Sequence, residues 1–342
     1  MIQHPFFSNK TRSKAPFKWA IHDCDKSILI VTAEQNGSTK TEEIEYPDTM
    51  WDFRYCNGII GFYSIEKGSY NLCLSNITTV ESIELEPPTD ESTDGGHFEL
   101  AFDSSSKKHK VLVWRECEDS KYYPSECYVR TLEEGTSWRP VSNVPQALRR
   151  RQHPHHERPQ FCCANGALFW FIGKEHIMVS FNVAREQFRT VKLPQKLSNM
   201  VNEKEFRYSI FEFEGYLCLV EQPSSAHNKF NLEIGNLWML KDIENNVWVT
   251  MLNNKMLPLE GTNLRNYFLE EDFPFDAIFL SQNGEILIAA TDEEQKYIFS
   301  YSFLSGQFKR IEIFGELGGI HHFRVNNYVE NYLSLEDFGW VF

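Results

Sequence analysis

Short apolar runs joined by tight turns recur along the chain. Residues 161–173 read FCCANGALFWFIG, in which two apolar runs flank Asn165-Gly166. Asn-Gly is typical of a two-residue hairpin turn, because both turn residues take positive φ and Asn and Gly tolerate it best. We therefore predict strands over 161–164 and 167–172. The same pattern occurs at 53–63 (FRYCNGIIGFY), 211–220 (FEFEGYLCLV) and 278–290 (IFLSQNGEILIAA).

The pattern repeats as a unit of about four strands. Two further apolar runs follow the turns at Asn57, Asn165 and Asn283, and the spacing from the turn Asn to the end of the last run is about 30 residues each time. These runs are 71–76 and 80–88, 177–183 and 186–194, and 297–303 and 306–314. Two units with longer insertions fit at 97–145 and 208–252. A shorter unit with only three strands fits at 17–47. Six such units match the repeat period of propeller blades.

The two ends of the chain indicate how the units close. The unit at 17–47 lacks a fourth strand, and residues 321–335 (HHFRVNNYVENYLSL) supply a spare one. A propeller closes when one terminus completes the other's blade, which leaves no open sheet edge. We predict an all-β fold, a six-bladed β-propeller closed by the C-terminal strand pairing into the N-terminal blade. An array of two-sheet sandwiches is the alternative.

Segments outside the repeat are few. Helical periodicity is nearly absent, and short helical turns are expected only around 196–206 and 258–272. Because the closing strand ties the last unit to the first, we expect one domain over 15–342, preceded by an N-terminal segment over 1–14.

Charge and cysteine use narrow the functional classes. Lys plus Arg number 34 and Asp plus Glu 48, and the net charge of −14 argues against phosphate-backbone binding to nucleic acid. The basic run 149–151 and its histidines are interpreted as a solvated loop.

No secretory signal and no apolar run long enough for a membrane span is found, so we expect an intracellular protein of the cytoplasm or nucleus. The eight cysteines form no C-x-x-C pair and are expected to be buried free thiols.

Candidate chemistry is sparse. Cys162 and Cys163 are adjacent on a predicted strand, so their side chains point to opposite faces and would not converge on a metal. The tract of His153, His155 and His156 lacks the further ligands of a zinc site. No Gly-rich phosphate loop, G-x-S-x-G or H-E-x-x-H motif occurs. We therefore predict no catalytic, cofactor-binding or metal residues and no cofactor, although the acidic residues leave a hydrolytic carboxylate pair open.

Short motifs occur in a fixed order over 15–335. They are Cys56-Asn57-Gly58-Ile59, Leu74-Ser75-Asn76-Ile77-Thr78, Ala101-Phe102-Asp103, His109-Lys110-Val111, Val129-Arg130-Thr131, Trp138-Arg139, Asn165-Gly166-Ala167-Leu168-Phe169-Trp170, Ser180-Phe181-Asn182, Glu186-Gln187-Phe188, Leu193-Pro194, Gly215-Tyr216-Leu217-Cys218, Leu237-Trp238-Met239-Leu240, Trp248 and Tyr328-Val329-Glu330-Asn331-Tyr332-Leu333-Ser334-Leu335. In this order the chain resembles the kelch-like F-box-associated domain of the plant F-box protein family.

The resemblance implies a function and its partners. Such domains form the substrate-recognition part of an F-box subunit in an SCF-type E3 ubiquitin ligase, which recruits a target protein for ubiquitination and is not itself catalytic. The helical F-box that docks onto the Skp-type adaptor is missing from this chain, so the adaptor and the cullin scaffold are expected partners only if the full-length protein has one. The target and the loops that bind it are not implied. A propeller enzyme (hydrolase or lyase) with a site in the central channel, and an F-box-less interaction protein without a ligase role, are the alternatives.

Overall fold

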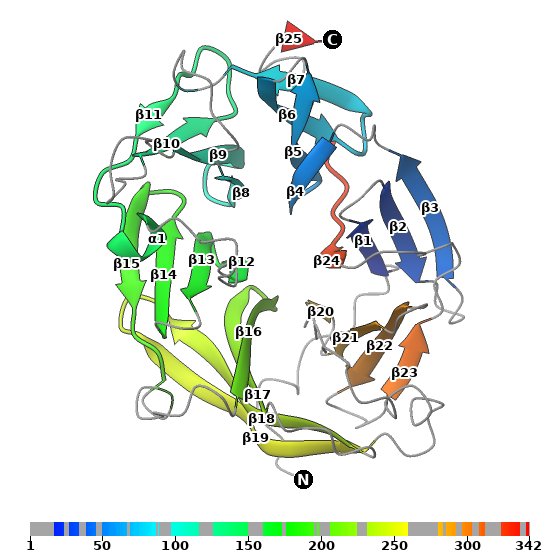
Figure 1. Cartoon of the computed structure of the whole chain (residues 1–342). Coiled ribbons are helices and arrows are strands. Elements are labelled where there is room, and N and C mark those ends of the chain that lie inside the picture. Colours follow the sequence, from blue (N-terminus) through cyan, green and yellow to red (C-terminus); the bar gives the residue numbers. More distant parts are fainter. Residues whose placement is uncertain are drawn as a thin grey trace. The chain divides into compact units, whose positions relative to one another are not determined.

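A computed structural model gives the fold of the chain. It describes residues 17–23, 27–33, 39–45, 50–66, 69–86, 88, 97–115, 126–149, 160–172, 176–194, 197, 206–223, 231–258, 280–282, 285–291, 296–302, 308–311, 323–335 and 340–341. The strands in these ranges form six antiparallel sheets (Figure 1). The chain divides into two compact units. Unit 1 comprises residues 1–23, 29–44 and 193–327, and unit 2 comprises residues 24–28, 45–192 and 328–342.

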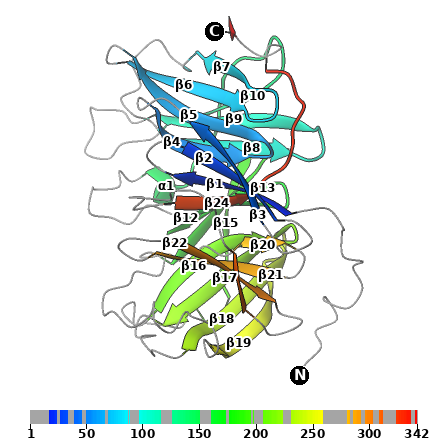
Figure 2. The ribbon, with the colours of Figure 1, turned by 90° about the vertical axis from the view of Figure 1, so that its right-hand side faces the viewer.

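Unit 1 holds three sheets of four strands. In the first, β24 (Phe323–Asn327), β1 (Phe17–Asp23), β2 (Ser27–Ala33) and β3 (Thr39–Glu45) lie side by side. The second follows chain order, β16 (Phe206–Phe213), β17 (Tyr216–Pro223), β18 (Asn231–Asp242) and β19 (Val247–Pro258), and Figure 2 shows these strands together. The third is β20 (Leu280–Gln282), β21 (Glu285–Thr291), β22 (Lys296–Ser302) and β23 (Phe308–Ile311).

Unit 2 holds the other three sheets. One has the order β25 (Trp340–Val341), β7 (Glu81–Leu85), β6 (Ser69–Asn76), β5 (Ile59–Glu66) and β4 (Met50–Cys56). The next is β11 (Arg139–Pro140), β10 (Glu126–Thr131), β9 (Lys108–Arg115) and β8 (His97–Asp103), and it is followed by the helix α1 (Gln146–Arg149). The last is β12 (Gln160–Ala164), β13 (Ala167–Ile172), β14 (Ile177–Asn182) and β15 (Gln187–Val191).

The sheets of unit 2 pack face to face because their middle strands are apolar on both faces. Successive side chains of a strand point to opposite faces. In β9, Val111 and Val113 belong to the core against the β4–β7 sheet, whereas Leu112 and Trp114 belong to the core against the β12–β15 sheet. All four side chains are buried. The continuous apolar run at 111–114 is therefore part of a strand between two cores, as in successive propeller blades.

The strand that completes the first sheet is the predicted one. β24 pairs antiparallel with β1 from Trp19 with Asn327 to Asp23 with Phe323. The prediction that the C-terminal strand joins the N-terminal sheet is thus confirmed. The described strands form six sheets, which equals the number of repeat units found in the sequence. The number of blades in a closed ring and the single domain over 15–342 stay predictions. The segment 1–14 lies outside the described residues.

Other boundaries differ from the sequence-based expectation. The expected fourth strand at 137–145 is reduced to the two residues of β11, and α1 follows where no helix was expected. The β18 and β19 strands are longer than predicted, with 12 residues each. β25 adds an unpredicted fifth strand to β7. Most of the two segments expected to hold helical turns, 196–206 and 258–272, lies outside the described residues.

Residues 328–335, here called the tail, lie across the turns of the β4–β7 sheet; Figure 2 shows the segment in red. The Asn331 side chain donates to the backbone oxygen of Asn57 at 2.7 Å, and the Asn331 N–H donates to Thr78 Oγ1 at 3.0 Å. In return, the Asn76 side chain donates to the backbone oxygens of Asn331 at 3.0 Å and Leu333 at 2.7 Å. The tail is thus bound by side chains that satisfy backbone groups on both sides.

Gly58 lets the tail come this close. Its φ is +86°, and a Cβ at this position would collide with the Asn331 side chain and lie 2.7 Å from the Val329 oxygen. The Tyr55 hydroxyl closes the contact, because it accepts hydrogen bonds from the N–H of Gly58 at 3.1 Å and from the N–H of Val329 at 2.8 Å. The second residue of the Asn57-Gly58 turn therefore needs glycine for two reasons, its backbone conformation and the space that the tail occupies.

We expect Gly58→Ala to lower the free energy of unfolding by roughly 3 kcal/mol, from a positive-φ penalty and a steric collision. Gly215→Ala is the matched control, since Gly215 has φ +87° but nothing lies within 4 Å of the position that a Cβ would take. The control should lose only about 1 kcal/mol. Urea denaturation of both variants measures the difference, and equal losses would show that the tail does not press on this turn.

Candidate interaction surface

One type of turn recurs at the strand ends. In four hairpins of the described ranges, the last residue of a strand is Asn or Asp, and its side-chain oxygen accepts a hydrogen bond from a backbone N–H two or three residues later. The residue four positions on has a positive φ, between 52° and 62°. The pairs of first and last residues are Asn76 and Val80, Asp103 and Lys107, Asn182 and Glu186, and Asp242 and Asn246. Such side-chain caps hold the turns in one conformation.

Asp103 shows how tightly one of these turns is capped. Its carboxylate accepts hydrogen bonds from the Ser105 N–H at 2.9 Å and from the hydroxyls of Ser105 at 2.6 Å and Ser106 at 2.8 Å. Burial acts to raise the pKa of Asp103, but these hydrogen bonds outweigh it and lower the pKa to about 2. The carboxylate therefore stays ionised and stabilises the turn at any pH above about 4.

Turns of the three sheets of unit 2 meet at one end. His109, at the start of β9, contacts the backbone oxygen of Cys56 beside the Asn57-Gly58 turn at 3.2 Å. A Cβ on Gly166 would lie 3.9 Å from Ser104 Oγ in the β8–β9 turn. We call this end the turn surface; it consists of the turns 57–58, 77–80, 104–107, 165–166 and 183–186 and of the tail.

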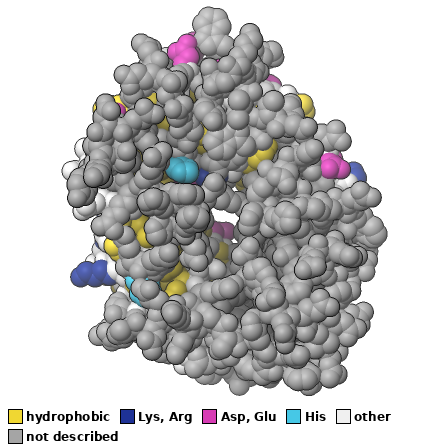
Figure 3. Space-filling model, viewed as in Figure 1, with side chains coloured by type: hydrophobic (Ala, Val, Ile, Leu, Met, Phe, Trp, Pro, Cys, Tyr) yellow, Lys and Arg dark blue, Asp and Glu magenta, His cyan; other side chains and the backbone are white. Residues whose placement is uncertain are grey.

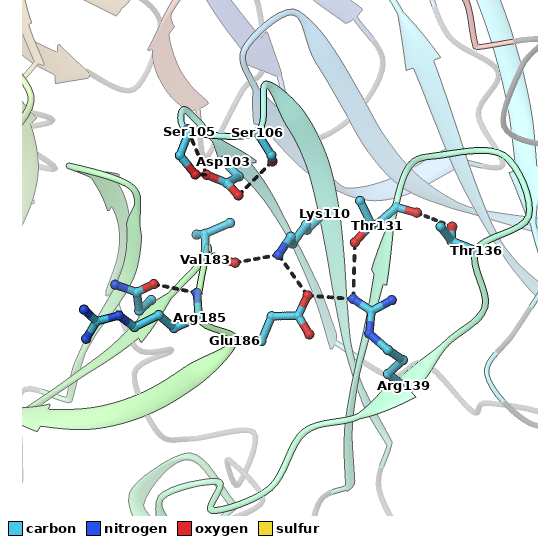
Figure 4. A network of polar contacts seen from close by, with 11 residues as sticks. Asp103, Ser105, Ser106, Lys110, Thr131, Thr136, Arg139, Val183, Arg185 and Glu186 are labelled. Atoms are coloured by element: carbon cyan, nitrogen blue, oxygen red, sulfur yellow. Dashed lines mark hydrogen bonds and ion pairs between the residues drawn. The ribbon is translucent and has the colours of Figure 1, made fainter.

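An ion-pair network joins two of the sheets at the turn surface (Figure 4). Glu186 Oε1, from the β14–β15 turn, lies 2.8 Å from Lys110 Nζ of β9 and 2.6 Å from Arg139 Nη2 of β11. Lys110 also donates to the Val183 backbone oxygen at 2.8 Å. Burial acts to raise the pKa of Glu186, but the hydrogen bonds and charges of Lys110 and Arg139 lower it overall. Because the Lys110 side chain is buried, this pairing is costly to break.

His109 connects the β8–β11 sheet to the turn that holds the tail. Its ring is buried among apolar groups, with the Phe102 ring at 4.9 Å between centroids. Burial lowers the pKa of His109 to about 4, so the ring is neutral at pH 7 and its Nε2–H donates to the Cys56 oxygen. Nδ1 has no hydrogen-bond partner. A neutral imidazole suits this site because a charged ring would be buried without a counter-ion.

The tail and the 77–80 turn carry exposed apolar side chains. Val80 is 85% exposed, Tyr332 76% and Val329 45%. The Thr78 hydroxyl joins the two segments, because it hydrogen bonds with the Tyr328 hydroxyl and accepts a hydrogen bond from the Asn331 N–H. The three side chains therefore belong to two segments that are held together. We call Val80, Val329 and Tyr332 the exposed apolar patch. In the described residues, the one other large apolar side chain that is similarly exposed is Val247 of unit 1.

The cysteines considered in the sequence have structural surroundings. Cys162 is buried and Cys163 is half-buried on β12, and both are free thiols. Cys163 hydrogen bonds with Cys56 of β4, and this contact together with burial raises the pKa of Cys56 well above its ordinary value. Burial likewise raises the pKa values of Cys127 and Cys218. A raised pKa keeps these groups as thiols, which are poor nucleophiles and metal ligands.

Most of the other residues considered above as candidate sites or thiols lie outside the described residues. They are His153, His155, His156, Arg150, Arg151, Cys24 and Cys117. Within the described ranges, no three His, Cys, Asp or Glu side chains are grouped so that they could hold a metal ion. None of the helical segments in those ranges has the length and apolar character that a membrane crossing requires. On the face seen in Figure 3, the described charged side chains stand singly rather than in a patch of one sign.

Antiparallel sheets of about four strands, packed face to face in unit 2 and joined by capped turns, define an all-β protein built like a propeller. A sequence profile of the family described as the F-box associated beta propeller domain matches residues 18–331. The chain belongs to this family. The β-propeller fold and the resemblance inferred from the motifs are thereby confirmed.

The relatives are F-box proteins of Arabidopsis thaliana. F-box protein At2g21930 is 28% identical over 193 residues, which are 54% of this chain and 43% of that protein. Putative F-box protein At5g62060 is 22% identical over 257 residues, which are 71% of this chain and 76% of that protein. The chain thus spans less than half the length of the first of these relatives. Among solved structures, a chain of a nidogen/laminin complex aligns over 86% of this chain and 93% of its own, with a TM-score of 0.44 and 9% identity.

We expect His109 to make the protein less stable as the pH falls from 6.5 to 4. Its pKa is lower in the folded state, so the unfolded state binds more protons in this window and the free energy of unfolding falls by about 3 kcal/mol at most. His109→Gln keeps a donor for the Cys56 oxygen but removes the titration, and should flatten this part of the profile.

Denaturation at a series of pH values measures the effect. The wild type, measured at the same pH values, is the reference for the slope. The Asp103 carboxyl contributes only below its ordinary value of 3.8, so it does not overlap this window. An unchanged slope in His109→Gln would contradict the assignment.

Proposed function

We propose that this chain is the substrate-recognition part of an SCF-type E3 ubiquitin ligase subunit and recruits a target protein for ubiquitination. The match of the F-box associated domain over residues 18–331 carries the proposal, because it relates the chain to F-box proteins along nearly its whole length. A Skp-type adaptor and a cullin scaffold are the further partners, in the cytoplasm or nucleus, when the full-length protein carries an F-box.

The geometry of unit 2 supports an interaction role. Stacked sheets with buried cores make a rigid frame, and the capped turns at one end present side chains in fixed positions. Binding residues are commonly placed on loops held by such a frame. A preformed surface loses little conformational entropy when a partner binds, so it favours recognition.

Within the described ranges, the buried acidic side chains serve the frame, which favours an adaptor over an enzyme. Glu99 of β8 pairs with Arg54 of β4 at 2.9 Å, and both side chains are buried. Glu221 of β17 accepts a hydrogen bond from the Asn236 side chain of β18. Asp103 caps its own turn, as described above. Each acid is used to join strands or to hold a turn, which is a structural role.

Affinity purification of the protein encoded by the full transcript, from plant cells, tests the proposal. We expect the Skp-type adaptor and a cullin to co-purify, and a bound target to gain ubiquitin when the protein is expressed. Residues 1–342 alone should bind the same target. If the full-length protein binds a target but neither the adaptor nor the cullin, the ligase role is wrong and the chain is an interaction protein of another kind.

A further inference from the structure

Val80 occupies a position that the fold itself does not favour. It ends the 77–80 turn with φ +62°, a conformation that is strained for a β-branched side chain. The equivalent positions of the three similar turns carry Lys107, Glu186 and Asn246, which are unbranched at Cβ. The Val80 side chain is 85% exposed, so burial does not compensate the strain. Strain of this kind persists at sites where another role outweighs stability.

Tyr332 is presented by a segment that is fixed on both sides. Its neighbours Asn331 and Leu333 are held by the hydrogen bonds from Asn76, and the Leu333 N–H donates to Asn331 Oδ1 at 2.9 Å. The ring nevertheless stays 76% exposed. A rigidly placed, exposed Tyr is the type of side chain that contributes most to protein–protein binding, because little entropy is lost when it is covered.

The charged residues within the two segments that carry the patch have one sign. The 77–80 turn with the residue that follows it, and the tail, contain two acidic residues and no Lys or Arg: Glu81 and Glu330. Glu330 is exposed, and its carboxylate accepts a hydrogen bond from the Tyr332 hydroxyl at 3.0 Å; Glu81 is half-buried and accepts a hydrogen bond from the Ser334 hydroxyl at 3.2 Å. An apolar centre with an acidic rim is complementary to an apolar side chain flanked by basic ones.

We propose that the exposed apolar patch of Val80, Val329 and Tyr332 docks a segment of a partner protein that presents an aromatic or aliphatic side chain flanked by Lys or Arg. The inference rests on the proposed function, for which it names the surface and the chemistry of the target. The partner's apolar side chain covers Val80 and Tyr332, and its cations face Glu330 and Glu81.

Selection from a phage-displayed library of random peptides on residues 1–342 tests the proposal. Enriched peptides should combine an aromatic or aliphatic residue with neighbouring Lys or Arg. Fluorescence polarisation of the enriched peptides, made synthetically with a dye, should show at least about tenfold weaker binding to Val80→Asn and to Tyr332→Ser. Val247→Asn, which removes a similarly exposed valine of unit 1, is the control and should bind as the wild type does.

Val80→Asn also separates the proposal from a loss of folding. Asn tolerates positive φ better than Val, so this variant should have a higher midpoint of thermal unfolding although it binds the peptides less well. Reduced binding together with reduced stability would contradict the proposal. So would enrichment of acidic peptides, equal binding to both variants, or self-association of the wild type that Val80→Asn abolishes.

These failures are distinct from a failure of the proposed function. If the full-length protein still assembles with the Skp-type adaptor and recruits a target, but the target binds Val80→Asn and Tyr332→Ser as tightly as the wild type, this docking surface is wrong and the ligase role stands.

Discussion

The contact between the tail and the Asn57-Gly58 turn is the constraint on which the turn surface depends. The Asn331 side chain reaches the Asn57 backbone, and the Asn76 side chain reaches back to the tail backbone. Because Gly58 has no side chain, the two backbones approach until the Tyr55 hydroxyl bridges them. This contact fixes the tail on the 77–80 turn, and so it fixes the relative positions of Val80 and Tyr332.

The same turn is supported from its other side. His109 donates to the Cys56 oxygen, and further along β9 Lys110 joins the ion-pair network of Glu186 and Arg139. Two adjacent residues of one strand thus reach the turns of the two neighbouring sheets of unit 2. Such contacts lower the conformational entropy of the turns, which in most proteins are more mobile than the strands. The result is a surface whose side chains are placed before any partner binds.

The apolar pattern predicts most of the sheet structure because the order of apolar and polar residues within a short stretch determines which faces of a strand are buried. The run at 111–114 is apolar on both faces since it lies between two cores, and Asn165-Gly166 marks the hairpin of β12 and β13 through a local φ requirement. The pairing of β24 with β1 follows from the missing strand of the first unit. Local rules of this kind suffice for strands and turns.

The candidate surface could not be predicted in the same way. The Asn76 contact with the tail joins residues 255 positions apart. The local sequence pattern of neither segment predicts this contact. Nor does the sequence show that Val80 takes a positive φ, because valine is among the residues least expected there. The motif that includes Asn76 and the motif of the tail were both visible as resemblances to a family, but their mutual contact is a property of the fold.

Amide hydrogen exchange of the tail tests the central claim most directly. The N–H groups of Val329, Asn331 and Leu333 donate to Tyr55 Oη, Thr78 Oγ1 and Asn331 Oδ1, with no strand pairing to protect them. If the tail is a fixed part of the surface, these amides exchange as slowly as those of the neighbouring strand β6. Exchange at the rate of a frayed chain end, while β6 remains protected, would contradict the account.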